Sequence, residues 1–267
     1  MQLNIRNLAF AACLLGAGAC AGANQDAQNE ITEQIPEQTP PLPNLPGNPQ
    51  TPPDADDHFV SLNGLNNFLL HTGNLVGGES SYTVEFFVKF DQVSTTQQGQ
   101  ALFAFVDSIG AVSNAQQATS LINPALPTLV AQNNGSGVGF QLNFVSGVWY
   151  HIVVSYAANG PGFKLRAYLD GFNLGTGSGS KAYISNSERF EMGKPFDVIG
   201  GKSAFLKGAI DGLRISRGIR YTAGIITVPD RRNMPADAST IAVWNFNETA
   251  GDGKYFDAVG QKMLEKK

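Results

Sequence analysis

The sequence predicts an all-β fold, in which antiparallel strands form a two-sheet sandwich or jelly roll. Residues 81–90 alternate without a break, because every even position is apolar while the odd positions are polar except for Phe87. This period of two is typical of a strand with one face in a core. Further short apolar segments follow, with turn residues about every ten residues, and no segment keeps a helical period.

The strands expected after this one are short. Asp170-Gly171 separates two of them by two residues, which predicts a tight hairpin turn. The Ala-, Gln- and Ser-rich segment 107–127 is expected to be a long loop, either a recognition loop or a variable insertion. The remaining strands are predicted at residues 101–106, 128–131, 138–145, 148–157, 163–169, 172–174, 190–192, 196–199, 209–216 and 240–246.

Composition excludes several classes of function. Charged residues make up 15% of the 267 residues, against roughly 25% in an average soluble domain. The net charge of −4 provides no basic surface for nucleic acid. Cys13 and Cys20 are the only cysteines. The part after them therefore has no disulfide, no thiolate metal site and no cysteine nucleophile.

The first nineteen residues have the layout of a signal peptide, in which Arg6 precedes an apolar stretch at residues 8–15 and small residues follow. Residues 17–20, Ala-Gly-Ala-Cys, resemble the bacterial lipobox, which implies cleavage before Cys20 and acylation of that cysteine. Ala21 stands where an Asp often signals inner-membrane retention in lipoproteins, so the resemblance favours a lipid anchor in the outer membrane. The alternative is an ordinary secretory signal with a chance cysteine.

A linker is expected at residues 20–56, between the signal peptide at 1–19 and one folded domain at 57–267. The linker is poor in aromatic residues and rich in Gln, Asn, Glu and Pro, so it cannot bury enough apolar surface to fold. Its prolines favour extended conformations that rise about 3.1 Å per residue. It is either a stalk that lifts the domain off a membrane or a linker without a selected role.

Three segments show which family the folded part resembles. They are GVWYHIVVSY at 147–156, FKLRAYLDG at 163–171 and KGAIDGLRI at 207–215. In this order and spacing they resemble the laminin-G-like members of the concanavalin A-like lectin and glucanase superfamily, over residues 57–260. The resemblance implies an antiparallel two-sheet jelly roll that binds more often than it catalyses. It does not name the ligand, because this fold carries many functions.

The resemblance also implies a metal site. Asp211, in Ile-Asp-Gly-Leu-Arg, matches a late-strand aspartate that binds a structural Ca²⁺ in related jelly rolls. Because Ca²⁺ takes six to eight oxygen ligands, backbone oxygens near residues 61–67 and another Asp or Asn would have to contribute. The alternative is that Asp211 bonds a backbone amide or pairs with Arg214 or Arg217.

Three residues are candidate ligand contacts. Arg166 and Tyr168 lie on the polar face of the strand predicted at 163–169, where an aromatic ring beside polar groups suits a sugar. Phe87, on an otherwise polar face, is the third. The alternatives are that Tyr168 is an ordinary sheet-surface residue and that Phe87 lies under a loop. His151 is expected to be a hydrogen-bonded histidine of the sandwich.

Motifs of enzymes are missing. The sequence lacks the closely spaced carboxylates of retaining glycoside hydrolases of this fold, and Glu188 and Glu191 have the wrong spacing. Gly-x-Ser-x-Gly and His-Glu-x-x-His do not occur. We therefore expect a non-catalytic surface lipoprotein that recognises a carbohydrate or protein ligand. The alternatives are a structural subunit of the envelope or of an appendage, and a degenerate glycoside hydrolase.

Overall fold

The computed structural model describes a β-sandwich within residues 57–267. The described residues are 57–92, 99–106, 115–122, 128–133, 136–142, 144–179, 187–198, 201–248 and 251–267, and they contain strands and no helix. Consequently no helix long and apolar enough to cross a membrane occurs among them. Cys20, the signal peptide and the linker lie outside the described residues.

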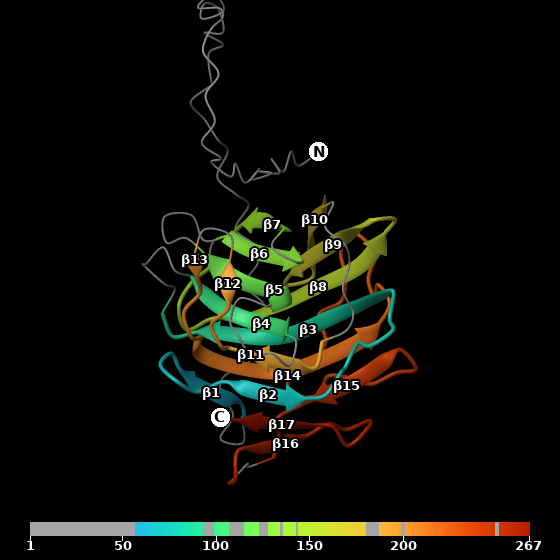
Figure 1. Ribbon diagram of the computed structural model, residues 1–267. Helices are drawn as coiled ribbons and strands as arrows, with labels where there is room; N and C mark the ends of the chain where they lie inside the picture. Colours follow the sequence, from blue (N-terminus) through green and yellow to red (C-terminus); the bar gives the residue numbers. More distant parts are fainter. Residues whose placement is uncertain are drawn as a thin grey trace, which may run out of the picture.

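Sheet A has seven strands, and every pairing between them is antiparallel. In spatial order the strands are β1 (Val60–Asn63), β14 (Lys207–Arg217), β3 (Ser81–Phe90), β8 (Trp149–Asn159), β9 (Gly162–Leu169) and β10 (Phe172–Gly179), and β15 (Thr240–Trp244) also pairs with β14. Figure 1 shows the long strands β3, β8 and β14 side by side in this sheet, and β3 carries the alternating apolar pattern that the sequence shows.

Sheet B has eight antiparallel strands, and its central strands lie in front of sheet A in Figure 1. A separate two-stranded hairpin is formed by β12 (Asp197–Val198) and β13 (Gly201–Lys202). In spatial order the strands of sheet B are β16 (Lys254–Phe256), β17 (Met263–Lys266), β2 (Leu69–Thr72), β11 (Arg189–Met192), β4 (Gln100–Val106), β5 (Ala115–Ile122), β6 (Thr128–Asn133) and β7 (Ser136–Gln141).

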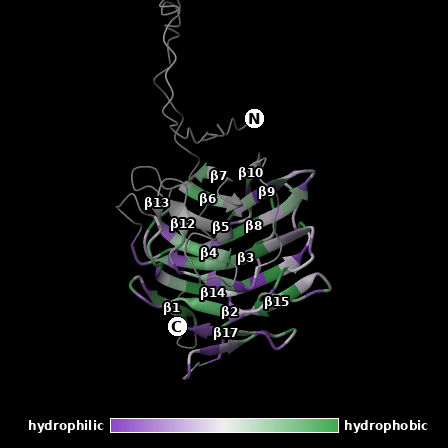
Figure 2. Cartoon of the chain, in the orientation of Figure 1, coloured by the Kyte–Doolittle hydropathy of each residue, from purple (hydrophilic) through white to green (hydrophobic). Residues whose placement is uncertain are grey.

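The main core lies between the two sheets, where apolar side chains from both inner faces meet. Two contacts cross the interface directly: the rings of Tyr82 and Phe105 have centroids 5.1 Å apart, and those of Phe86 and Phe103 are 5.9 Å apart at nearly a right angle. Burial of each such side chain contributes about 1.5–3 kcal/mol. Figure 2 shows the same arrangement, with hydrophobic colour along the strands and hydrophilic colour at many turns. The all-β sandwich predicted from the sequence is confirmed.

The hairpin predicted at Asp170-Gly171 is also confirmed. Leu169 of β9 pairs with Phe172 of β10, so two residues form the turn. Both adopt positive φ, 47° at Asp170 and 84° at Gly171, as the favoured two-residue hairpin turn requires. A Cβ atom on Gly171 would lie 2.6 Å from the carbonyl oxygen of Ile226, so glycine is also needed for space.

One long segment changes the environment of sheet A. Residues 218–239, here called the strap, connect β14 to β15. They cross the outer face of sheet A and form hydrogen bonds with it along their length. Tyr168 donates its hydroxyl to the oxygen of Ala223, and the N–H of Ile226 donates to the oxygen of Gly171. The prediction that β3 is half-buried is therefore wrong, because side chains of its outer face are buried as well.

Other element predictions differ from the structure in identifiable ways. The segment expected to be one loop at 107–127 contains β5, a strand too polar to be distinguished from a loop by its pattern. The strand expected at 138–145 ends at Gln141. β1, β2, β16 and β17 were not predicted, because strands of three or four residues are too short to show an alternation.

Candidate ligand-binding surfaces

The strap covers Phe87. Its side chain packs with Met234 of the strap and Val243 of β15, in a small core separate from the main one. The ring also lies 4.8 Å from that of His151. Phe87 is only 2% exposed. The structure agrees with the alternative that Phe87 lies under a loop, and the ring of Phe87 offers no surface to a ligand.

Tyr168 is also buried under the strap. Its hydroxyl donates to the oxygen of Ala223 at 2.8 Å, and its ring meets the ring of Tyr221 edge-on at 6.0 Å. The residue has no exposed surface. A sugar could not stack on this ring without displacing the strap, so neither Tyr168 nor Phe87 belongs to the surface proposed below.

A buried polar network fastens the strap to sheet A. Oε2 of Glu85 accepts hydrogen bonds from Nε and Nη2 of Arg214, at 3.0 and 2.5 Å. Oε1 accepts from Nε2 of His151 and from the hydroxyl of Tyr221, both at 2.9 Å. Arg214 also donates to the oxygen of Pro235. His151 is thus hydrogen-bonded within the sandwich, as expected, although its Nδ1 has no partner.

The carboxylate of Glu85 stays ionised in this setting. Burial raises its pKa, but the hydrogen bond and charge of His151, together with those of Arg214, bring the pKa below its ordinary value. All three side chains are at most 1% exposed. Since no solvent reaches the carboxylate, the network holds the fold together and offers no site for chemistry on a ligand.

Asp211 is buried in a different ion pair. Oδ1 accepts from the N–H of Gly212 at 2.8 Å, and Oδ2 contacts Nη1 of Arg231 at 2.5 Å. Arg231 also reaches both carboxylate oxygens of Asp57, at 2.7 Å. The cation partner is Arg231 rather than Arg214 or Arg217. Burial raises the pKa of Asp211 to about 7, although the Arg231 guanidinium opposes this shift.

These residues do not fit a calcium ion. A guanidinium occupies one side of the Asp211 carboxylate, and a second cation there would be repelled. The amides of Asn63, Asn66 and Asn67 bond within their own turn. Within the described ranges, no three His, Cys, Asp or Glu side chains are grouped to hold a metal. Calcium at Asp211 stays a prediction from the resemblance.

Arg166 lies on sheet A next to the region that the strap covers. Its Nη1 donates to the oxygen of Tyr221 at 3.3 Å and its Nε to the hydroxyl oxygen of Thr176 at 3.4 Å. Lys164, two residues earlier on the same face of β9, is exposed and lies opposite Ser178 of β10. Arg166 is therefore the one candidate contact whose surroundings include open surface.

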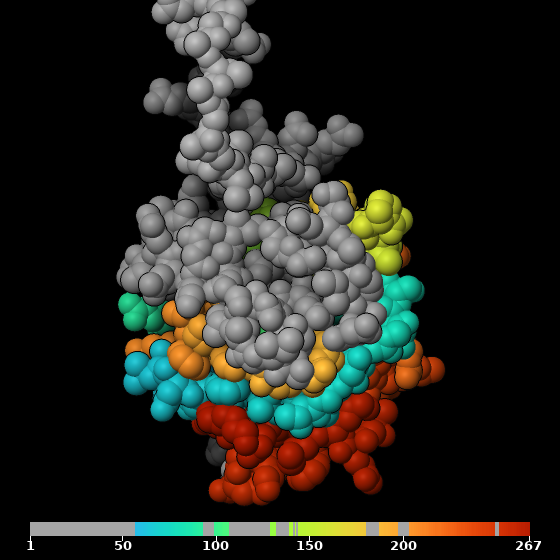
Figure 3. Space-filling view, in the orientation of Figure 1, coloured from blue at the N-terminus to red at the C-terminus, as the bar shows by residue number. Residues whose placement is uncertain are grey.

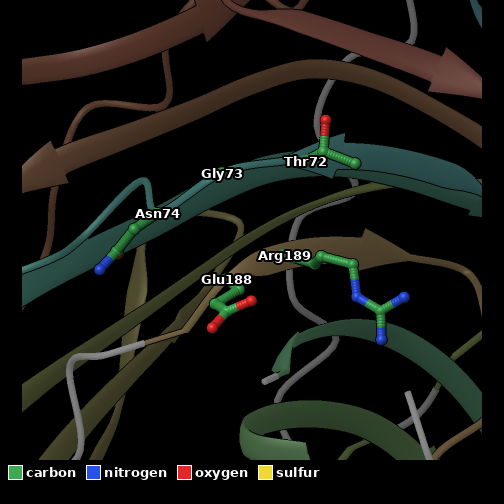
Figure 4. Close-up of a pocket in the computed structure, with 5 residues that line it drawn as sticks. All are labelled: Thr72, Gly73, Asn74, Glu188 and Arg189. Carbon is green, nitrogen blue, oxygen red and sulfur yellow. The ribbon is translucent and has the colours of Figure 1, made fainter. Parts of the chain in front are cut away.

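A pocket of about 400 Å³ opens in sheet B where β2 ends and the neighbouring strand β11 begins (Figure 4). Thr72, Gly73 and Asn74 line it from the end of β2, and Glu188 and Arg189 line it from the start of β11. The backbone joins the two sides, because the N–H of Gly73 donates to the oxygen of Glu188 at 2.7 Å. The side chain of Glu188 is exposed, and among the described residues no hydrogen bond or ion pair engages it.

The chemistry of this pocket is mixed. The residues that line it carry a hydroxyl, an amide, a carboxylate and a guanidinium, which include both donors and acceptors. The amide of Asn74 is held in place, because its Oδ1 accepts from the N–H of Val76 at 3.1 Å. The sequence did not point to this site, since its two sides lie more than a hundred residues apart. The only local feature that could have indicated a binding site is the turn Asn74-Leu-Val-Gly-Gly, and it contains no aromatic residue of the kind used to predict a sugar contact.

The pocket lies on the surface formed by β2 and the segments beside it. Figure 3 shows the β1–β2 region in cyan above the red C-terminal residues, as one continuous surface of the described chain. The contact is direct, because β17 pairs with β2 through Glu265 and Leu70. His71 of β2 is fixed from the same side, with Nδ1 2.8 Å from the oxygen of Met263. The β2 side of the pocket is therefore a rigid part of the sandwich.

Comparison with solved structures finds the same architecture. A protein from Bacteroides ovatus with proposed carbohydrate binding matches at a TM-score of 0.51 and 17% identity, over 78% of this chain and 56% of that protein. A heptameric pentraxin from Limulus polyphemus matches at 0.46 and 20% identity, over 61% and 76%. Mouse laminin α1 domains LG4-5 match at 0.43 and 9% identity, over 61% and 42%. At 17% identity the likeness to the Bacteroides ovatus protein concerns the fold alone.

Comparison at the level of sequence places the family. No protein with a curated description matches the chain. The family model described as the concanavalin A-like lectin/glucanases superfamily, Laminin_G_3, matches residues 63–225, which include the three segments that carry the resemblance. This match spans more than half of the chain and covers the strands from β2 to β14. The chain therefore belongs to the concanavalin A-like lectin/glucanase superfamily.

Proposed function

We propose that this chain is a non-catalytic binding protein that recognises a glycan at the pocket between β2 and β11. The observation that carries the proposal is the mixed set of donors and acceptors at Thr72, Asn74, Glu188 and Arg189. Each sugar hydroxyl both donates and accepts a hydrogen bond, so a surface with both kinds of group suits it. Family membership supports binding as a class of function and leaves the ligand open.

Glu188 is the residue on which this proposal is tested. Its carboxylate is exposed and has no partner within the described part of the chain, so it can accept bonds from two hydroxyls of one sugar ring. Hydrogen bonds to a charged group are worth about 1.5–3 kcal/mol. Glu188→Gln keeps the shape and removes the charge, and should weaken binding about ten-fold or more.

The experiment starts with a glycan array on the purified protein and continues with titration calorimetry of the strongest neutral glycan. The control is Glu248→Gln, which removes an exposed carboxylate near β16 while keeping an oxygen for the N–H of Phe256. Loss of affinity in Glu188→Gln alone supports the pocket. If Glu188→Gln binds the glycan as tightly as Glu248→Gln, the pocket is refuted as the binding site. Hydrolysis of the glycan during titration refutes the non-catalytic role.

We further propose that Cys20 is acylated and attaches the protein to a bacterial outer membrane. The proposal rests on the lipobox-like residues 17–20 and on Ala21. Several acyl chains hold far better than one, at about 0.8 kcal/mol per buried methylene. Metabolic labelling with radioactive palmitate should label the parent protein and not Cys20→Ser. Label that persists in Cys20→Ser would contradict the anchor.

A further inference from the structure

The exposed corner of sheet A formed by β9 and β10 carries two cations beside two hydroxyls. The strand register places Arg166 opposite Thr176 and Lys164 opposite Ser178. A bulge between Asn173 and Gly175 shifts the register of β10 and keeps both hydroxyls on the outer face. Opposite side chains on neighbouring strands lie about 5 Å apart, and next-but-one residues about 7 Å. The four groups therefore form one compact array.

Every group in this array can donate a hydrogen bond toward a ligand. Nε of Arg166 donates to the oxygen of Thr176, which leaves the hydroxyl proton of Thr176 to point elsewhere. Nη1 of Arg166 donates to the oxygen of Tyr221 in the strap, which fixes the guanidinium, and Nη2 forms no hydrogen bond with the described residues. Lys164 is exposed, and no residue that the structure describes forms an ion pair with it.

The array contains no carboxylate. The carboxylate of Glu79 pairs with Arg217, and that of Asp237 pairs with Arg220. Asp170, on the same face of β9, lies four residues beyond Arg166 and accepts from the N–H of His151. Two cations with two hydroxyl donors, and with no unpaired carboxylate beside them among the described residues, call for a ligand that supplies acceptors and negative charge.

We infer that the Lys164–Arg166–Thr176–Ser178 array binds the oxyanion groups of an acidic polysaccharide. The inference goes beyond the pocket between β2 and β11, which would hold sugar hydroxyls, and it concerns a different sheet. The net charge of −4 opposes nonspecific adsorption of a polyanion, so such a ligand needs a local array of this kind. Arginine suits sulfate or carboxylate because its guanidinium can donate two parallel hydrogen bonds.

The test compares dextran sulfate with uncharged dextran of the same length, by titration calorimetry on the full chain at low and at high salt. The parent protein should bind dextran sulfate, and added salt should weaken this binding. Lys164→Gln and Arg166→Gln should each lower the affinity about ten-fold, by the worth of a charge-assisted hydrogen bond. Lys164→Arg should bind like the parent, because it keeps the charge.

Lys254→Gln is the matched control, since Lys254 is exposed on β16 of the other sheet. Because Arg166 also touches the strap, Lys164→Gln decides the case if Arg166→Gln lowers stability, since the Lys164 side chain forms no hydrogen bond or ion pair with the described residues. Equal affinity of the parent and Lys164→Gln for dextran sulfate overturns the inference. Preferential binding to phosphatidylglycerol vesicles over dextran sulfate, lost in Lys164→Gln, overturns it in favour of a lipid headgroup.

The outcome is separable from that of the pocket. Binding of a neutral glycan that depends on Glu188 and ignores Lys164→Gln leaves the proposed function standing while this inference fails. Binding of dextran sulfate that depends on Lys164 and is unchanged in Glu188→Gln supports this inference whatever the pocket does.

Discussion

Replacing Glu85 by Gln should destabilise the protein far more than a surface ion pair would. The carboxylate accepts four hydrogen bonds, two from Arg214 and one each from His151 and Tyr221. In Gln the terminal NH₂ must face one of these pairs of donors, whichever way the amide is turned. Arg214, which is 1% exposed, is then left as a buried cation without its counter-charge.

The expected cost is about 3–5 kcal/mol, the range measured when one partner of a buried ion pair is removed. This is a large part of the roughly 5–15 kcal/mol by which a domain is stable. Urea unfolding followed by circular dichroism measures the change, provided that the slope with denaturant stays constant. The control is Glu79→Gln, because the exposed Glu79–Arg217 pair is worth at most about 1 kcal/mol.

A loss below about 1 kcal/mol in Glu85→Gln would refute this reasoning. It would mean that water reaches Arg214 and replaces the lost bonds, so that the strap does not close over sheet A. Such a result would also return Phe87 and Tyr168 to the surface available to a ligand.

Three further predictions concern the same layer. Because the folded-state pKa of Glu85 is lowered, the stability that its carboxylate contributes is complete above the ordinary carboxyl pKa and is lost as pH falls toward the folded value. Urea unfolding between pH 6 and 3 should show this loss of stability, and Glu85→Gln should flatten the pH dependence. Tyr168→Phe should cost about 1–2 kcal/mol, measured the same way, since it leaves the oxygen of Ala223 without its donor, and no change would exclude that bond. Gly171→Ala should cost more than about 1 kcal/mol in thermal unfolding, because of its positive φ and the nearby oxygen of Ile226, whereas an unchanged melting temperature would contradict the turn.

Local patterns in the sequence were enough to predict the sandwich. The alternation of Ser81–Phe90 and the Asp170-Gly171 turn depend on neighbouring residues and on the backbone conformation they allow. These local signals fix strands and hairpins without information on long-range contacts. The family resemblance carried by 147–156, 163–171 and 207–215 added the two-sheet order.

The site could not be predicted in the same way, because it depends on what covers each face. The odd positions of β3 are mostly polar, which indicated solvent, yet Thr83, Glu85 and Phe87 are buried and Glu85 forms an ion pair with Arg214. Nothing in residues 218–239 has a strand period that would reveal this role. Phe87 and Tyr168 were therefore offered as candidate ligand contacts, with burial of Phe87 under a loop as the alternative, and Glu188 was considered only as a catalytic residue.

Mapping a bound glycan by nuclear magnetic resonance tests the central claim most directly. We expect the strongest neutral glycan from the array to shift the backbone amides of Thr72, Gly73, Glu188 and Arg189, at the pocket between β2 and β11. Amides of β3 and β9 beneath the strap should stay unchanged. Shifts centred on Phe87 and Tyr168, with the pocket unaffected, would contradict the account.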